Sequence, residues 1–469
     1  MMRIGIIHLV VAAVLACVLH AGADPAEYPK DTGYRGIWYY NQKTNDEYVY
    51  KYSGGLGTYC AKHIPMAIYA PAVNKTFFVY GGTKPGENAL LEMISYYDHA
   101  TGEVPRPVIL LDKKTEDAHD NPVLAIDDGG YLWVFASAHG TSRPAYIFKS
   151  TQPYSIDDFE LVLETNYSYP QPWYITGKGF LFIHTAYDGG RALSWQTSPN
   201  GKMWSERKRF SFFGEGHYQI SWPRGTSVGT AFNYHPKAFQ GDAKRHGLNW
   251  RTNVYYAETH DMGATWQTIT GEPLQIPLSD PHNPALIREY ESEGLLAYVK
   301  DLNYDAQGRP VLLHVTAPSW EPGPEHGPRE WRVAHWKGDA WAWHSVTTSD
   351  NNYDTGSIHV EADGTWRIIG PSENGPQAFN PGGEVAMWVS KDEGATWTRE
   401  RLITHDSPFN HTYCRRPLNA HPDFYAFWAD GHGRQPSESR LYFCDQTGTR
   451  VRRLPYVMEG DTAKPEELP

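Results

Sequence analysis

One hairpin pattern recurs seven times along this chain of 469 residues and constrains its fold more than any other feature. Each copy opens on a polar or aromatic residue, runs through an apolar stretch, turns at Gly, Asp or Asn, and closes on an aromatic or β-branched stretch. The copies are His63–Tyr80, His119–His139, Tyr169–Tyr187, Tyr218–His235, His282–Lys300, Tyr353–Gly370 and Tyr413–Asp430. Apolar runs flanking a short turn are typical of β-hairpins, and their regular recurrence indicates blades. The sequence therefore predicts an all-β fold, a seven-bladed β-propeller.

The repeats are expected to form one domain, because a propeller grows by adding blades around an axis instead of enlarging a single core. We expect the propeller to span residues 24–459 and a polar C-terminal tail to occupy residues 460–469. Residues 36–40 (GIWYY) precede the first copy and are expected to complete the last blade. Their predicted partner is the segment Leu441-Tyr442-Phe443.

The N-terminus is typical of a secretory signal peptide. Residues 1–23 carry Arg3, the apolar run Ile4–Leu19 and a small-residue end, so a secreted or periplasmic chain would begin near Asp24. A lipoprotein signal ending at Cys17 is the alternative. The rest of the chain has no apolar run of membrane-spanning length and no Lys/Arg block, and the formal net charge of all 469 residues is −12. Neither a membrane nor a nucleic acid is an expected partner, and we expect a monomer.

Three further segments are predicted to be structural turns of the Asp-box kind. Thr259–Trp266 and Ser390–Trp397 fit the pattern Ser/Thr-x-Asp-x-Gly-x-Thr-Trp, and Ser198–Trp204 is one residue short of it. In such a turn the Asp side chain accepts backbone N–H groups, the Gly adopts a positive φ, and the Trp packs between blades. We expect these segments to have a structural role and no catalytic one.

Three cysteines follow the signal segment: Cys60, Cys414 and Cys444. Cys60 and Cys414 occupy matching positions at the entries of the first and last blades, which are neighbours in a closed ring. We expect their sulfurs to approach each other, as a disulfide or around a structural metal, with Cys444 apart. Three buried free thiols are the alternative.

The entry of each innermost strand faces the axis of a propeller, so residues distant in sequence form a ring there. The predicted ring is rich in His and Tyr, and the far ends of the second strands add more. Such a set is suited to proton transfer near neutral pH. Its predicted members are His63, His119, Tyr169, Tyr218, His282, Tyr353 and Tyr413, with His139, Tyr187 and His235 at the far ends.

The chain resembles the BNR-4 repeat propellers that include the ulvan lyases. The resemblance rests on His119-Asp120-Asn121-Pro122, the turn 127–130, His139, Ser168-Tyr169-Pro170-Gln171 and the segment 375–384 (GPQAFNPGGE), and it covers nearly all of the mature chain. The family pattern has two histidines in the second blade and a tyrosine and an arginine in the third. Here these correspond to His119, His139 and Tyr169, and the nearest arginine to the expected place is Arg191.

The resemblance implies a secreted polysaccharide lyase that cleaves an anionic, ulvan-like polysaccharide by β-elimination at a uronic acid. It implies that Tyr169 is a base or proton relay and that His119 and His139 are acid/base and carboxylate-neutralising groups. Arg191 would clamp the anion, and the expected substrate-binding side chains are Tyr187, Arg224, His235 and His63. A structural divalent metal, calcium or zinc, is common in this group, and no organic cofactor is expected.

Two other functions stay open. A related group of propellers hydrolyses rhamnose-glucuronate linkages with a histidine on the opposite face, for which His63 is the candidate. A non-catalytic carbohydrate-binding propeller is the second alternative, because a fold alone does not set a function. A sialidase is disfavoured, since His63-Ile64-Pro65 stands where its Arg-Ile-Pro would be expected.

Overall fold

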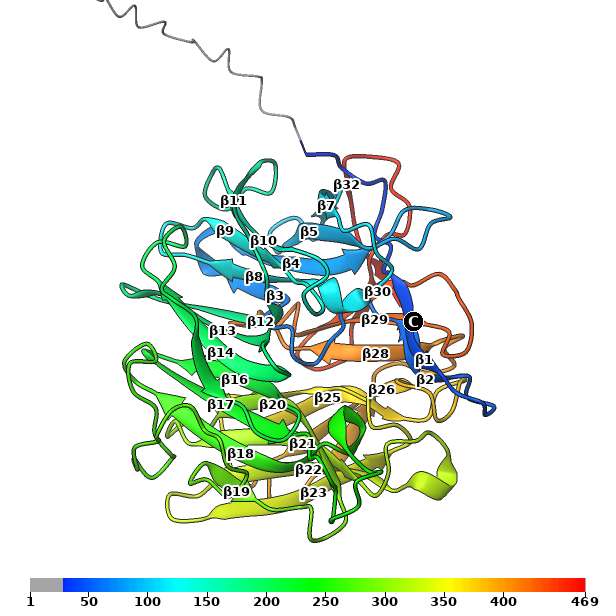
Figure 1. The fold of residues 1–469 in the computed structure, drawn as a ribbon. Helices are drawn as coiled ribbons and strands as arrows, with labels where there is room; N and C mark the ends of the chain where they lie inside the picture. The colour runs from blue at the N-terminus through cyan, green and yellow to red at the C-terminus, as the bar shows by residue number, and fades with distance from the viewer. Residues whose placement is uncertain (1–27, 469) are drawn as a thin grey trace, which may run out of the picture.

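Seven β-sheets follow one another around a common axis in the computed structural model, which describes residues 28–468 (Figure 1). Six sheets have four strands and the last has five, so the predicted seven-bladed propeller is confirmed. In each blade the first strand pairs with the second as an antiparallel hairpin. This is the arrangement that the repeated apolar–turn–apolar pattern predicts.

The first four blades are formed in chain order. Blade 1 consists of β3 (Ala67–Ala70), β4 (Lys75–Gly82), β5 (Leu91–Asp98) and β7 (Val108–Asp112). Blade 2 consists of β8 (Pro122–Ile126), β9 (Leu132–Ala136), β10 (Ala145–Ser150) and β11 (Phe159–Thr165). Blade 3 consists of β12 (Ser168–Ile175), β13 (Gly179–Tyr187), β14 (Arg191–Ser198) and β15 (Lys208–Ser211). Blade 4 consists of β16 (His217–Arg224), β17 (Ser227–Tyr234), β18 (Thr252–Thr259) and β19 (Leu286–Arg288).

The last three blades complete the ring. Blade 5 consists of β20 (Leu296–Tyr304), β21 (Pro310–Ala317), β22 (Arg329–Trp336) and β23 (Trp341–Ser349). Blade 6 consists of β24 (Ser357–Val360), β25 (Trp366–Glu373), β26 (Glu384–Ser390) and β27 (Thr398–Leu402). Blade 7 consists of β28 (Asn410–Arg415), β29 (Ala426–Gly431), β30 (Leu441–Cys444), β31 (Val451–Arg453) and β33 (Glu466–Glu467).

The remaining elements are short. A separate hairpin is formed by β1 (Trp38–Lys43) and β2 (Tyr50–Gly55), and a two-stranded sheet joins β6 (Val104–Pro105) to β32 (Thr462–Ala463). Four single-turn 3₁₀ helices are η1 (Pro71–Val73), η2 (Ala118–Asp120), η3 (Gly247–Trp250) and η4 (Pro324–His326). Within residues 28–468, no helix has the length and apolar character needed to cross a bilayer.

The predicted fifth copy, His282–Lys300, is wrong. His282 is exposed in the loop before β19, the outermost strand of blade 4, and the inner hairpin of blade 5 is β20–β21. The apolar residues on either side of residues 289–294 do form strands, but these strands belong to two different blades. A local sequence pattern predicts that a segment is a strand, but it does not determine which sheet that strand joins.

The ring does not close as predicted. Residues 38–43 pair with β2 and not with β30, because both edges of β30 are already occupied by β29 and β31. Blade 7 is therefore built from C-terminal residues alone, and the segment 460–469 supplies its outermost strand, β33. The signal-peptide prediction for residues 1–23 lies outside the described residues.

The cysteine prediction is also wrong. Cys60, Cys414 and Cys444 are all buried and free. Cys60 packs among tyrosines beside Tyr413, whereas Cys414 packs with Cys444 between blades 6 and 7. Cys60 lies in irregular backbone and lines the cavity, whereas Cys414 lies in β28 and packs away from the cavity, so matching positions in the chain did not bring the two sulfurs together.

The turn Thr259–Trp266 lies between the third and fourth strands of blade 4. The carboxylate of Asp261 accepts the backbone N–H of Thr265 at 2.8 Å and its hydroxyl at 2.6 Å. The buried ring of Trp266 lies 5.6 Å from the ring of Trp195 in blade 3. The turn therefore packs one blade against the next, at a distance from the axis.

Gly263 in this turn gives the first prediction. Its φ is +78°, and an added Cβ would lie 2.3 Å from Nε1 of Trp195. Gly263→Ala is expected to cost more than about 2 kcal/mol in the free energy of unfolding, from left-handed strain and the clash together. The matched control is Gly271→Ala, where φ is +85° but no atom lies within 4 Å, so only strain of about 1 kcal/mol applies. Equal shifts in the denaturant midpoints of the two variants would contradict the packing argument.

Candidate active site

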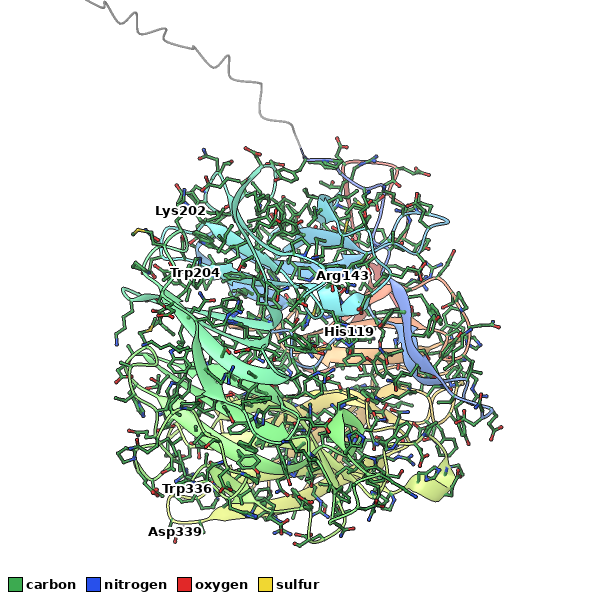
Figure 2. The ribbon with its side chains drawn as sticks, viewed as in Figure 1. His119, Arg143, Lys202, Trp204, Trp336 and Asp339 are labelled. Carbon is green, nitrogen blue, oxygen red and sulfur yellow. The ribbon has the colours of Figure 1, made fainter. Side chains whose placement is uncertain are left out.

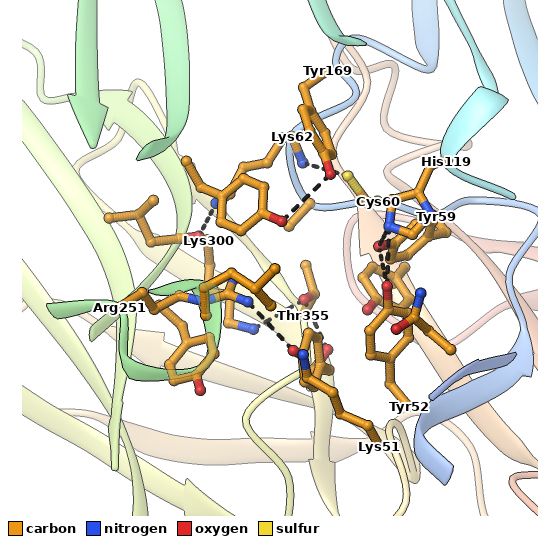
Figure 3. Close-up of a pocket in the computed structure, with 18 of the residues that line it drawn as sticks. Lys51, Tyr52, Tyr59, Cys60, Lys62, His119, Tyr169, Arg251, Lys300 and Thr355 are labelled. Atoms are coloured by element: carbon orange, nitrogen blue, oxygen red, sulfur yellow. Dashed lines mark hydrogen bonds between the residues drawn. The ribbon is translucent and has the colours of Figure 1, made fainter. Parts of the chain in front are cut away.

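A cavity of about 190 Å³ lies where the entries of the inner strands converge (Figure 3). Figure 2 shows His119 near the middle of the molecule, whereas Asp339, in the β22–β23 turn, lies at the outer edge of the molecule. The wall combines side chains from six blades with the β1–β2 hairpin. Its ionisable members are Lys51, Tyr52, Tyr59, Cys60, Lys62, His119, His139, Tyr169, Arg191, Tyr218, Arg251, Tyr298, Lys300, Tyr353 and Tyr413.

Breaks in strand register aim several of these side chains at the cavity. The pairing of β12 with β13 shifts between Ser168 and Gln171, and Tyr169 within the break has a φ of 55°. Tyr413 in β28 has a φ of 50° at the same kind of break. A left-handed tyrosine costs about 1 kcal/mol, and β-bulges re-aim side chains next to functional sites. The two tyrosines with strained backbone conformations, Tyr169 and Tyr413, therefore both lie at the cavity.

Asp117 holds two histidines of blade 2 together. Its Oδ1 accepts from Nδ1 of His119 at 2.5 Å and its Oδ2 from Nδ1 of His139 at 2.8 Å. The two imidazole rings stack with centroids 3.8 Å apart. Arg143 Nη2 donates to Asp117 Oδ2 at 2.9 Å and pairs in two hydrogen bonds with the buried Asp120. Both histidine Nδ1 atoms thus carry protons, which leaves each Nε2 as an acceptor when the ring is neutral.

The two Nε2 atoms differ in environment. Nε2 of His119 is 2.6 Å from the Tyr59 hydroxyl and 3.0 Å from the Tyr52 hydroxyl, as Figure 3 shows. For Nε2 of His139 no hydrogen-bond partner is found within residues 28–468, and its side chain is 24% exposed at the cavity. His139 is therefore the histidine of this pair that is open to accept a proton from a bound molecule.

Burial and charge set the protonation states. Burial works to raise the pKa of Asp117, but the charges and hydrogen bonds of His119 and His139 outweigh it and hold that pKa well below its usual range. Burial, with His139 acting the same way, lowers the pKa of His119 to about 4. Burial raises the pKa of Tyr169 well above 10, although Arg191 opposes it. At neutral pH the carboxylate is ionised, His119 is neutral, and Tyr169 keeps its proton.

Arg191 reaches the cavity from the β13–β14 hairpin, where it pairs directly with Tyr187. Its guanidinium carbon lies 5.5 Å from the Tyr187 ring centroid and 5.9 Å from that of Tyr218. Its Nε is buried and has no hydrogen-bond partner in the described part of the chain. The side chain lines the cavity and forms no ion pair with a carboxylate within residues 28–468, so its charge is available to an oxyanion.

Four more basic side chains line the cavity: Lys51, Lys62, Arg251 and Lys300. Among the described lining residues there is no Asp or Glu, although the whole chain carries a formal net charge of −12. Burial lowers the pKa values of Lys51 and Lys62 well below 10.5 and that of Lys300 to about 7. A concentration of basic groups in a wall whose described residues include no carboxylate favours an anionic ligand, which would restore their protons.

The four predicted catalytic side chains, His119, His139, Tyr169 and Arg191, all line this cavity. Tyr187 lies behind the wall, in contact with Arg191. The other three predicted substrate contacts do not reach it. His63 and His235 are fully buried, and Arg224 donates to the carbonyl of Gly308 at the β20–β21 turn.

Sequence reasoning missed Asp117, Arg143 and the basic wall. Asp117 had a local signal, a carboxylate two residues before a candidate catalytic histidine, which is a spacing that lets its side chain reach both the backbone and the ring of His119. Lys51, Lys62, Arg251 and Lys300 had none, because they are scattered through the chain.

Within residues 28–468, metal-ligating side chains come together in two groups. These are Asp117, His119 and His139 in the cavity, and His99, His421 and Asp423 elsewhere. The cavity group does not fit a metal ion, because both oxygens of Asp117 already accept hydrogen bonds, from the two Nδ1 atoms and from Arg143.

Comparison with known proteins identifies the family and the fold. The model of the BNR repeat-containing family matches residues 95–349. The chain is 23% identical over 451 residues to an ulvan lyase of Nonlabens ulvanivorans, covering 87% of this chain and 89% of that protein. It is 22% identical to an ulvan lyase of Alteromonas sp. (strain LOR), covering 93% of each. A solved PL25 ulvan lyase bound to -[GlcA(1-4)Rha3S]- superposes with a TM-score of 0.71 at 17% identity, over 90% of this chain and 96% of that one. The structural likeness establishes the shared fold.

Proposed function

The chain belongs to the BNR repeat-containing family, and from that premise we propose that it is a polysaccharide lyase acting on an ulvan-like, uronate-containing polysaccharide. The observation that carries the proposal is the cavity itself. It places an imidazole acceptor on His139, a protonated phenol on Tyr169 and several basic groups around one space. These are the three requirements of β-elimination: a base, an acid and neutralisation of the carboxylate.

The proposed reaction uses the residues as follows. Arg191 and the basic wall bind the uronate carboxylate, which makes the C5 proton more acidic. That proton passes to Nε2 of His139, whose other nitrogen is held by Asp117. The electron pair forms the C4–C5 double bond, the C4–O4 bond breaks, and O4 takes the proton of Tyr169. Solvent then returns a proton to Tyr169 and removes one from His139, so the enzyme is restored.

The roles of Tyr169 and His139 follow from their surroundings. Since burial raises the pKa of Tyr169, its hydroxyl is a donor in the free enzyme, which favours the acid role over the base role. His119 has its Nε2 engaged by Tyr59 and Tyr52. It is better suited to positioning Asp117 and His139 than to attacking the substrate.

The structure offers less support to a glycoside hydrolase. His63, the candidate for that chemistry, is fully buried, and its Nδ1 lies 3.0 Å from the carbonyl of Asn121. Most glycosidases need a carboxylate pair, and the described wall of the cavity contains none. A single test separates the functions. Ulvan is incubated with the purified protein, and ultraviolet absorbance of the unsaturated uronate is followed together with new reducing ends.

A lyase produces both signals. Reducing ends without the absorbance would indicate a hydrolase, and binding without either signal would indicate a carbohydrate-binding propeller. We further propose that the chain is exported, as residues 1–23 suggest, since a polysaccharide substrate is met outside the cell. Finding the full-length chain only in the cytoplasmic fraction would contradict this.

The pH dependence of KM gives a second prediction. Burial lowers the pKa of Lys300 from 10.5 to about 7, so the free enzyme holds this charge below about pH 7 and loses it above. KM for the anionic substrate is therefore expected to rise as the pH passes through 7. Lys300→Arg, which stays protonated, should show a smaller rise of KM over the same range. Identical KM profiles for the two proteins would contradict the assignment.

A further inference from the structure

Two imidazoles and a carboxylate meet at the seam between the first and last blades. His99 follows β5 in blade 1, while His421 and Asp423 lie in the loop between β28 and β29 in blade 7. The centroids of the two imidazole rings are 3.7 Å apart. One ligand atom from each of the three side chains lies within 4.8 Å of the other two. Unlike the cavity residues, these three come from the far ends of their strands.

The imidazole of His99 is held so that one nitrogen has no partner. Its Nε2 lies 2.8 Å from Oγ1 of Thr76. With Nε2–H donating to that hydroxyl, Nδ1 carries a lone pair. Nδ1 is buried and has no hydrogen-bond partner within residues 28–468. Buried nitrogens are seldom left unsatisfied, and a second-shell bond of this kind is what orients metal-binding histidines.

The side chains of His421 and Asp423 in blade 7 are also held by hydrogen bonds. Oδ1 of Asp423 accepts from Arg450, and Oδ2 is left free. Oδ2 lies 4.0 Å from Nδ1 of His421. That Nδ1 accepts only a 3.1 Å bond from the backbone N–H of Asp423, a contact that a metal ion would replace.

We propose that His99, His421 and Asp423 bind one zinc ion across this seam. Two imidazoles and one carboxylate form a typical zinc set, whereas calcium takes oxygen ligands. Ligand atoms around a tetrahedral zinc lie about 3.4 Å apart, so small side-chain rotations close the site. All three side chains are partly exposed, which leaves room for a water molecule as the fourth ligand.

The ion would stabilise the contact between blades 1 and 7, where the ring closes. Because blade 7 is built from C-terminal residues alone, no blade shares strands from both ends of the chain. Blades 1 and 7 are joined by the β6–β32 pair and by a bridge between Ile68 and Leu418. A zinc ion held by both blades adds a crosslink there. Its effect is therefore expected on stability and not on turnover.

The test uses chelator-stripped full-length protein and zinc chloride alone. After gel filtration, the wild type is expected to retain about one zinc per chain and to show a higher Tm than the stripped protein. Replacing zinc by cobalt should give the strong visible absorbance of a tetrahedral site. His99→Gln and Asp423→Asn should each lose the retained metal, the Tm rise and the cobalt spectrum, while their metal-free Tm and their lyase activity stay near those of the wild type.

Two controls sharpen the result. His405→Gln removes an exposed histidine next to Asp406 in blade 6 and should leave zinc retention intact. Asp117→Asn disrupts the other ligand group and should also leave it intact. Zinc retained by His99→Gln but lost from Asp117→Asn would overturn the proposal by placing the ion in the cavity. Failure of the stripped wild type to retain zinc would overturn it outright, whatever the result of the ulvan assay.

Discussion

Asp117→Asn is expected to lower kcat by on the order of a thousandfold, the larger of the two effects that the cavity predicts. The carboxylate accepts hydrogen bonds from Nδ1 of both His119 and His139. An amide offers one oxygen and one NH2 group, so at least one imidazole must turn to the other tautomer. If His139 turns, its Nε2 carries the proton and can no longer accept one from C5. Steady-state kinetics on ulvan measure the loss.

The pH profile separates this role from a general structural one. In Asp117→Asn the imidazolium form of the histidine pair loses its counter-ion, so the acidic limb of the kcat/KM profile should move to lower pH. The control is Asp128→Asn, on the β8–β9 turn of the same blade, where the exposed carboxylate accepts from the backbone of Gly177. It should leave kcat and the profile unchanged. A reduced kcat in Asp117→Asn with an unmoved profile would mean that the residue only supports the fold.

Tyr169→Phe is expected to lower kcat by on the order of a hundredfold or more, the usual scale for losing an acid/base partner. The hydroxyl is lost, but the ring keeps its packing against Tyr218 at 5.2 Å and His63 at 5.7 Å between centroids. The Tm should therefore stay close to that of the wild type. Rates of unsaturated-uronate formation and a thermal melt measure the two quantities.

Tyr80→Phe is the matched control for this change. Its hydroxyl is buried in blade 1 and has no hydrogen-bond partner in the described part of the chain, and it does not line the cavity. Turnover should be unaffected. If Tyr169→Phe kept full activity while His139→Gln lost it, the proton for O4 would have to come from another donor, and the acid role of Tyr169 would be wrong.

Much of the architecture was predictable because local sequence patterns determine it. Alternating apolar runs and turn residues specify hairpins, and their recurrence specifies blades, since each hairpin must bury its faces against the next. The wrong predictions concern features that a local sequence pattern does not determine, such as which blade a strand joins. Residues 282–300 contain parts of two strands, and only the packing of β19 against β18 assigns the first of them to blade 4.

The site divides in the same way. The sequence by itself determined that His119, His139 and Tyr169 stand near the starts or ends of inner strands, where a propeller directs them to its axis. Only the tertiary structure decided that Asp117 bridges both imidazoles and that Lys51, Arg251 and Lys300 share one wall with Arg191. The physical reason is that charge interactions depend on distance in space, and the ring brings together residues from the β1–β2 hairpin and blades 3 to 5. The protonation states follow from the same enclosure, since burial is a property of the folded ring and not of any segment of the chain.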